Sequence, residues 1–176
     1  VKKNPINNLM LGDYLPAEHF FVPAMLSIDS SAWWDQANLK GTISHLVPSL
    51  KIILPDLEYI SFISNPHKIR ERFALVKLKH NKKPLPLSSL GDGSTRLLNI
   101  ILALINCENG YLLIDEIDSS MYFELLPKMW DLIAQLAEKL NIQVFATTHS
   151  FDCVYALAKT FSDSNKENIA AIIRLN

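Results

Sequence analysis

The stretch Tyr111-Leu112-Leu113-Ile114-Asp115-Glu116 decides the fold prediction, because apolar residues run directly into two adjacent acids. A short, fully apolar run is typical of a strand buried in a parallel sheet. Ligands of such sheets bind outside the carboxyl ends of the strands, where these acids would stand. There Asp115 would hold Mg²⁺, directly or through water, and Glu116 would act as a general base on an attacking water. The alternative, without a catalytic role, is a strand that ends at a charged turn.

Helices and strands alternate around this stretch, with helices recognised by apolar residues at helical spacing. The predicted elements are a buried helix over 94–106, a strand over 111–115, a helix over 124–140, a strand over 142–147, a helix over 151–159 and a final strand over 168–175. Strand, helix and strand at these lengths predict βαβ units and a mostly parallel sheet flanked by helices. The predicted fold class is therefore α/β.

The first half of the chain is less regular. We predict a short edge strand over 20–22 that Pro23 ends, a helical region over 31–51 interrupted by Gly41 and Pro48, strands over 57–64 and 73–79, and a loop over 81–86. The adjacent Trp33 and Trp34 favour core or interface packing over a recognition surface. We expect residues 1–84 to form a small connecting portion of helix and hairpin, and residues 85–176 to form the main lobe.

A glycine-rich loop, Ser88–Arg96, precedes the buried helix. Gly91 and Gly93 allow a close approach of the backbone to a phosphate, and the helix that follows directs its free N–H groups at such an anion. Ser94 would cap this helix or contact phosphate, and Arg96 would add charge. An ordinary loop with an ordinary helix cap fits the same residues.

A third polar segment, Ala146-Thr147-Thr148-His149-Ser150, ends the next predicted strand. His149 at that position would reach a γ-phosphate or the hydrolytic water. A lone histidine is more often structural, so this segment gains meaning only beside the other two.

Composition excludes several classes of protein. The 176 residues have a formal net charge of −1, which provides no electrostatic argument for a nucleic-acid or membrane partner. For the basic stretch 77–83, a solvated hairpin end is favoured over a binding patch. Cys107 and Cys153 lie far apart without metal-ligand spacing, which argues against a zinc site or a disulfide scaffold. Without an apolar run of about 18 residues or a signal peptide, we expect no membrane span and a cytoplasmic location.

The order of the three segments resembles the ABC-type ATPase heads of the SMC-like and OLD-like group, whose fold is P-loop NTPase-like. The segments that match its motifs are Leu90–Leu98 for the signature, Leu112–Glu116 for the Walker B strand, Asp118–Met121 for the D-loop and Thr147–Ser150 for the switch histidine. The resemblance implies an ATP site whose nucleotide-binding residues are Gly91, Asp92, Gly93, Ser94, Arg96 and Asp118. It implies Asp115 as the Mg²⁺ ligand, with Glu116 and His149 as the catalytic pair.

The resemblance also implies partners. Two heads of this group dimerise around ATP, so a homodimer or a partner ATPase half is expected, with action on DNA or on an associated nuclease, in phage defence among other settings. Three departures stand against it. The signature reads Leu-Gly-Asp-Gly-Ser-Thr-Arg rather than the transporter form, Ser120-Met121-Tyr122 replaces the usual Gly-Leu-His, and none of the five glycines begins a P-loop.

The missing P-loop, together with the first residue Val1, predicts a piece of a longer protein whose phosphate cradle lies upstream or on a partner. Alone, such a piece would hydrolyse ATP poorly. The rival hypothesis is a non-catalytic assembly or interaction module that retains an ATPase shape. A transporter ATPase subunit is a weaker rival, because the signature does not have the transporter form.

Overall fold

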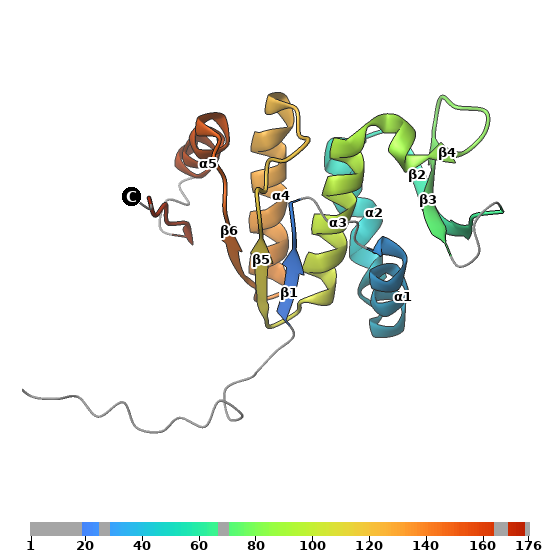
Figure 1. Ribbon diagram of the computed structural model, residues 1–176, viewed down its shortest axis with the longest axis horizontal. Coiled ribbons are helices and arrows are strands. Elements are labelled where there is room, and N and C mark those ends of the chain that lie inside the picture. The colour runs from blue at the N-terminus through green and yellow to red at the C-terminus, as the bar shows by residue number, and fades with distance from the viewer. Residues whose placement is uncertain (1–18, 25–28, 67–70, 164–168, 175–176) are drawn as a thin grey trace, which may run out of the picture.

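The computed structural model describes residues 19–24, 29–66, 71–163 and 169–174. Figure 1 shows a parallel sheet with α4 and α3 beside it, followed by α2 and α1, and a second sheet at the far end. The predicted α/β fold is confirmed: a parallel sheet packs against helices, and a helical and hairpin portion lies in the chain between the first and second strands of that sheet.

The parallel sheet has three strands in the order β1-β5-β6. They are β1 (His19–Val22), β5 (Tyr111–Ile114) and β6 (Gln143–Ala146). The predicted acidic strand is thus the central one, with Phe21 and Phe145 as the register partners of Leu113 on either side. The carboxyl ends of all three strands meet at one edge of the sheet.

The two faces of this sheet differ in burial. Val22, Leu112 and Ile114 are fully or almost fully buried, on the face that packs against α3 (Asp92–Asn106). Their neighbours Leu113 and Phe145 point the other way and remain 44% and 51% exposed.

Helix α3 is the centre of the core and contacts α1, α2, α4 and β1. Leu97 to Asn106 are all buried, and each buried Leu or Ile contributes roughly 1.5–3 kcal/mol of stabilisation. The helix begins at Asp92, two residues before the predicted start. The expected cap Ser94 is the third helical residue instead, because Gly91, with φ of 100°, is the N-cap.

The N-terminal portion follows the prediction with one addition. Helix α1 (Ser30–Lys40) is capped by Asp29, whose carboxylate accepts from the backbone N of Ser31 at 3.1 Å, and it ends at Gly41 with φ of 76°. After it come the 3₁₀ turn η2 (Thr42–His45), helix α2 (Leu46–Ile53), and the strands β2 (Leu57–Ser64) and β3 (Arg72–Leu78). The predicted loop over 81–86 was wrong at its end, since β4 (Leu85–Pro86) pairs with β3 after the 79–84 turn.

The two tryptophans pack inside the molecule, as the packing interpretation predicts. Trp33 meets the ring of Phe20 edge-on with centroids 5.5 Å apart, and Trp34 lies 5.1 Å from Phe62. Both tryptophans are half-buried against the core, so the pair joins β1 and the β2–β3 hairpin to α1.

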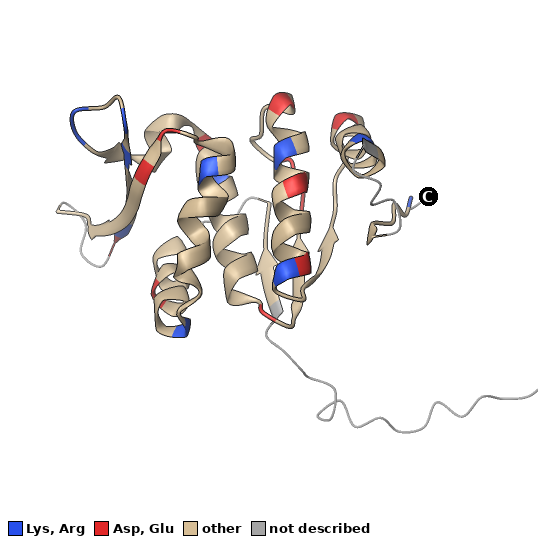
Figure 2. Ribbon diagram, turned by 180° about the vertical axis from the view of Figure 1, so that it is seen from behind, with Lys and Arg blue, Asp and Glu red and all other residues tan. Residues whose placement is uncertain are grey.

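Two helices complete the second half. A 3₁₀ turn, η4 (Phe123–Leu125), leads into α4 (Leu126–Lys139), and α5 (Phe151–Asp163) extends beyond its predicted end at residue 159. Figure 2 shows acidic and basic positions alternating along α4, as expected of a helix with one solvated face.

The predicted final strand over 168–175 was wrong for the residues described. Residues 169–174 form no strand, and Ile172 and Ile173 are 55% and 82% exposed. A run of β-branched residues favours an extended chain, but a strand also needs a partner ladder, which tertiary structure decides. Within the described ranges, no helix is both long and apolar enough to cross a membrane.

Candidate active site

The acids at the end of β5 lie where the three strand ends are joined by backbone bonds. The backbone N of Asp115 donates to the carbonyl oxygen of Val22 at 2.9 Å, and that of Thr147 donates to Ile114 O at the same distance. The ladder therefore continues one residue beyond β5 and β6. It fixes the positions from which the polar side chains project.

The hydroxyl of Thr147 connects β6 to both acids. It donates to Oδ1 of Asp115 at 2.7 Å and accepts from the backbone N of Glu116 at 2.9 Å. One threonine thus orients the carboxylate of Asp115 and also satisfies the amide that follows it.

Glu116 has a left-handed backbone, with φ of 45°. For a residue with a side chain this conformation costs about 1–3 kcal/mol and persists only where the surroundings hold it. Here Thr147 holds both sides of the turn: its hydroxyl binds the amide of Glu116, and its carbonyl accepts from the N–H of Ile117 at 3.0 Å. The turn redirects the chain at the sheet edge.

An open pocket of about 320 Å³ lies beyond this turn. Its lining residues are Glu116, Asp118, Ser119, His149 and Ser150. Three side chains that the sequence singled out, Glu116, Asp118 and His149, are therefore brought together. The hydroxyl of Thr148 donates to Oδ1 of Asp118, which joins the end of β6 to the loop after the acids.

The residues that line this pocket do not include those of the glycine-rich loop. Gly91 and Asp92 are exposed at the start of α3, and a Cβ on Gly91 would meet open space. A Cβ on Gly93 would lie 2.7 Å from the carbonyl oxygen of Ser120, so this glycine allows α3 to pack on the loop after the acids. The Ser94 hydroxyl donates to Leu90 O at 3.4 Å.

Arg96 was predicted to add charge for a phosphate, and its guanidinium is instead buried beneath the strand ends. It donates to the carbonyl oxygens of Pro23 at 2.5 Å and Asp115 at 2.6 Å. Thr147, Thr148 and Ser119 lie within the segments that the sequence matched to the switch-histidine and D-loop motifs, but the sequence interpretation gave none of them a role of its own.

The donor set suits a hydrated magnesium ion better than an ion enclosed by protein. Among the described residues no group of three or more His, Cys, Asp or Glu side chains is arranged to hold a metal. Mg²⁺ commonly takes one or two carboxylates and completes its shell with water and phosphate oxygens. Asp115 meets this requirement, since its Oδ1 binds Thr147 and no described residue bonds its other carboxylate oxygen.

Cys153 lies one turn into α5 and is fully buried. Burial, and secondarily the charge of Asp118, raises its pKa to about 11. The thiol is therefore protonated at neutral pH and does not serve as a nucleophile. Its backbone carbonyl accepts from the indole N–H of Trp130 at 3.1 Å, which joins α5 to α4.

Comparison with known proteins was made on both sequence and structure. The chain is 31% identical over 94 residues to an "ATP/GTP phosphatase" of Helicobacter pylori (strain ATCC 700392 / 26695), a match that covers 51% of this chain and 25% of that protein. The chain thus spans about a quarter of the length of this relative. A solved structure described as "Structural biochemistry of ATP-driven dimerization and DNA stimulated activation of SMC ATPases" aligns with a TM-score of 0.45 at 13% identity, covering 69% of this chain and 77% of the other.

A family model matches residues 15–152, most of the chain, including the acidic strand and His149. Its description is "AAA domain, putative AbiEii toxin, Type IV TA system". The chain belongs to this AAA domain family.

Proposed function

We propose that this chain is the acid-bearing lobe of an ABC-type ATPase of the SMC-like and OLD-like group, and that its parent protein hydrolyses ATP with Mg²⁺. The observation that carries the proposal is the pocket at the carboxyl edge of the parallel sheet, where Glu116, Asp118 and His149 converge. Ligands of parallel sheets bind at this edge. Membership of an AAA domain family supports the same conclusion.

Each residue has a distinct role in the proposal. Glu116 accepts the proton of the attacking water, and His149, which also lines the pocket, contacts the γ-phosphate or that water. Asp115 would hold Mg²⁺ through its Oδ2, with Thr147 fixing Oδ1. The ion, when bound, would neutralise charge on the β- and γ-phosphates.

The phosphate cradle comes from elsewhere in this proposal, because the 176 residues contain no Gly-x-x-x-x-Gly-Lys-Ser/Thr motif. Another segment of the parent protein or a partner subunit supplies it. The exposed start of α3, with Gly91 and Asp92, would face the nucleotide of the partner in a dimer. In this arrangement residues 85–176 form most of the ATPase lobe. Residues 1–84 connect it to the remainder of the head and also supply β1, one strand of its sheet.

The proposed consequences of hydrolysis are action on DNA or control of an associated nuclease, with phage defence as one setting. Their support is the resemblance of the motifs alone. Stimulation of ATP turnover by added duplex DNA in the parent protein is the direct test of the first, and unchanged turnover would argue against it.

The central test is Glu116→Gln in the parent protein. Loss of a general base lowers turnover by about 100- to 10,000-fold, whereas binding of ATP, measured by equilibrium dialysis, should change little. Glu108→Gln is the matched control, because Glu108 lies in the turn before β5, at the opposite edge of the sheet. Undiminished turnover in Glu116→Gln would overturn the assignment of the base.

A non-catalytic assembly module is the second candidate, and the lack of a P-loop motif in these residues favours it. Under this alternative the parent protein and its partner subunit together bind no ATP. Dialysis with ATP and Mg²⁺ distinguishes the two candidates before any mutation is made.

A further inference from the structure

Arg96 is an uncommon residue for the interior of a helix packed in a core. It is only 7% exposed, and an arginine remains charged in proteins. Its hydrogen bonds go to backbone carbonyls: Nη1 donates to Pro23 O at 2.5 Å, and Nη2 donates to Asp115 O at 2.6 Å and to Glu116 O at 3.3 Å.

A charge buried in this way opposes stability unless its surroundings compensate. Burial lowers the pKa of Arg96, while the charges of Asp115, Glu116 and Asp118 act in the opposite direction. In the described structure its Nε has no hydrogen-bond partner. An apolar side chain of similar volume would fill the same space at lower electrostatic cost, so packing alone does not explain an arginine here.

The hydrogen bonds of the guanidinium explain better why an arginine stands at this position. Pro23 follows β1, and Asp115 and Glu116 follow β5, so one planar group joins the carboxyl ends of two neighbouring strands. The two β5 carbonyls belong to consecutive residues, and the second is Glu116, whose φ is 45°. Arg96 therefore holds this left-handed turn from the α3 side, while Thr147 holds it from the β6 side.

We propose that Arg96 is a positioning residue, which fixes the backbone turn at 115–116 so that Glu116 faces the pocket. Its positive charge also lies close to Asp115, Glu116 and Asp118, and it offsets their mutual repulsion before a cation binds. The catalytic consequence of this inference rests on the proposed function, whereas its structural consequence stands on the geometry alone.

Two variants separate the charge from the fork geometry. Arg96→Lys keeps the charge but cannot span both strand ends, and Arg96→Met keeps an apolar stem of similar length without charge. Asn106→Leu is the matched control. Asn106 is also buried on α3, donates to the backbone carbonyl of Trp33 at 2.9 Å, and has one buried atom without a partner in the described structure, but it lies at the other end of the helix.

The first readout is hydrogen exchange of the amides of Glu116 and Ile117 in this chain, because both amides are bound to Thr147. We expect exchange at least about 10-fold faster in both Arg96 variants, relative to the average of the α3 amides. Asn106→Leu should leave this ratio unchanged. An equal change in all three variants, or none in the Arg96 variants, would overturn the inference.

The second readout is ATP turnover in the parent protein. A displacement of a catalytic group by about 1 Å costs on the order of 100-fold, so kcat should fall by about that factor in Arg96→Met while KM stays within about 2-fold. Full turnover in Arg96→Lys would show that charge alone suffices and would overturn the positioning role. If the unmodified protein shows no turnover, the proposed function fails and the exchange experiment still decides the inference.

Discussion

The two sheets of this molecule differ in where they hold strained or unusual structure. The antiparallel sheet pairs regularly from Ser64 to Tyr59 against β3, with one irregularity near Leu57. The parallel sheet has non-glycine residues with positive φ in the connections at both of its edges. At the amino edge these are Asn109 and Asn141, a residue type that tolerates this conformation. At the carboxyl edge they are Glu116 and Ser120, which do not favour it.

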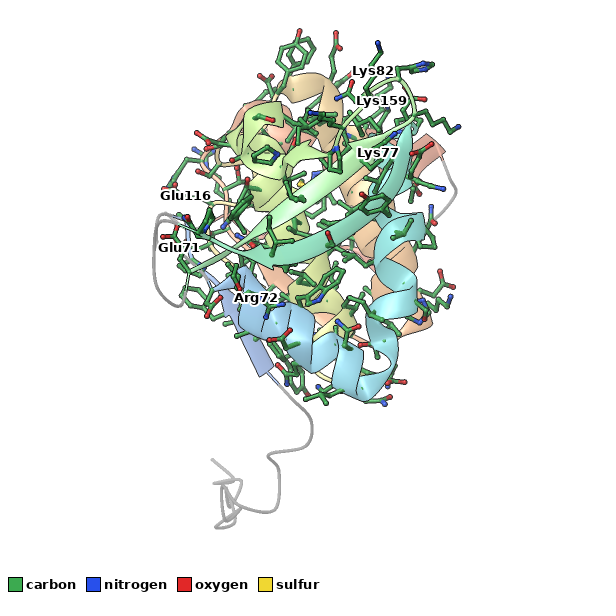
Figure 3. The ribbon with its side chains drawn as sticks, turned by 90° about the vertical axis from the view of Figure 1, so that its right-hand side faces the viewer. Glu71, Arg72, Lys77, Lys82, Glu116 and Lys159 are labelled. Atoms are coloured by element: carbon green, nitrogen blue, oxygen red, sulfur yellow. The ribbon has the colours of Figure 1, made fainter. Side chains whose placement is uncertain are left out.

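The side-chain contacts around the two sheets also differ. Around the antiparallel sheet they include simple ion pairs, Arg72 with Asp35 at 2.6 Å and Lys77 with Glu58 at 2.9 Å. In Figure 3, Lys77 and Lys82 lie well away from Glu116. At the carboxyl edge of the parallel sheet, the hydroxyl of Thr147, the guanidinium of Arg96 and the carbonyl oxygen of Val22 all bind two consecutive residues, the acids after β5. Strain at a place so fully determined by its neighbours is an indication of function. The described residues of the antiparallel sheet include no non-glycine residue with positive φ, as expected of a scaffold.

The largest effect that sharpens this comparison is expected from Asp115→Asn. Removing the charge that would hold the metal should lower ATP turnover of the parent protein by about 100- to 1,000-fold, the range typical for loss of a key electrostatic contact. Asp35→Asn, which breaks the ion pair beside the antiparallel sheet, should leave turnover unchanged. Steady-state phosphate release measures both, and equal losses would remove the distinction between the two regions.

The second effect concerns the packing of α3 on the loop after the acids. In Gly93→Ala the new Cβ would lie 2.7 Å from the carbonyl oxygen of Ser120, and overpacking of this kind costs about 1–3 kcal/mol. Urea denaturation should show this loss in the free energy of unfolding. Ser94→Ala, one residue further, loses the long contact to Leu90, and its free energy of unfolding should differ from that of the unmodified chain by less than about 0.5 kcal/mol. If Gly93→Ala were as stable as the unmodified chain, the loop after the acids must shift at no cost in free energy.

The third effect tests the link between β6 and the acids. Thr147→Val keeps the shape of the side chain but removes the hydroxyl that binds Asp115 and Glu116. The free energy of unfolding should fall by about 0.5–1.5 kcal/mol, and turnover by about 10-fold, which corresponds to 1.4 kcal/mol. Thr147→Ser retains the hydroxyl and should restore most of the turnover. Equal turnover in the two variants would rule out the hydroxyl as the cause.

The smallest effect is expected at the antiparallel sheet. Lys77→Met removes the ion pair with Glu58, and surface pairs contribute about 0–1 kcal/mol. Turnover should not change, and any difference in the free energy of unfolding should shrink in high salt, where such pairs are screened. A loss of turnover there would contradict a purely structural role for this sheet.

The sequence predicted correctly those elements that depend on a short run of consecutive residues. The apolar run before Asp115 predicted a strand, of which only one face is buried, and the nearly continuous apolar stretch after Ser94 predicted a buried helix, because the apolar pattern lies in consecutive residues. The sequence pattern failed where the formation of a strand depends on a pairing partner elsewhere in the chain. Residues 169–174 have strand-forming composition yet form no strand, and Leu85 pairs with β3 although its neighbourhood reads as a loop.

The candidate site divides in the same manner. By itself, the sequence determined which residue types are available and where they stand along the chain: the acids after β5, the glycines at the start of α3 and His149 after β6. Only the tertiary structure decided that Glu116, Asp118 and His149 share a pocket, that Thr147 orients Asp115, and that Arg96 lies beneath the strand ends. The physical reason is that hydrogen bonds and close contacts between residues 19 to 73 positions apart depend on strand order and helix packing, which no local pattern contains.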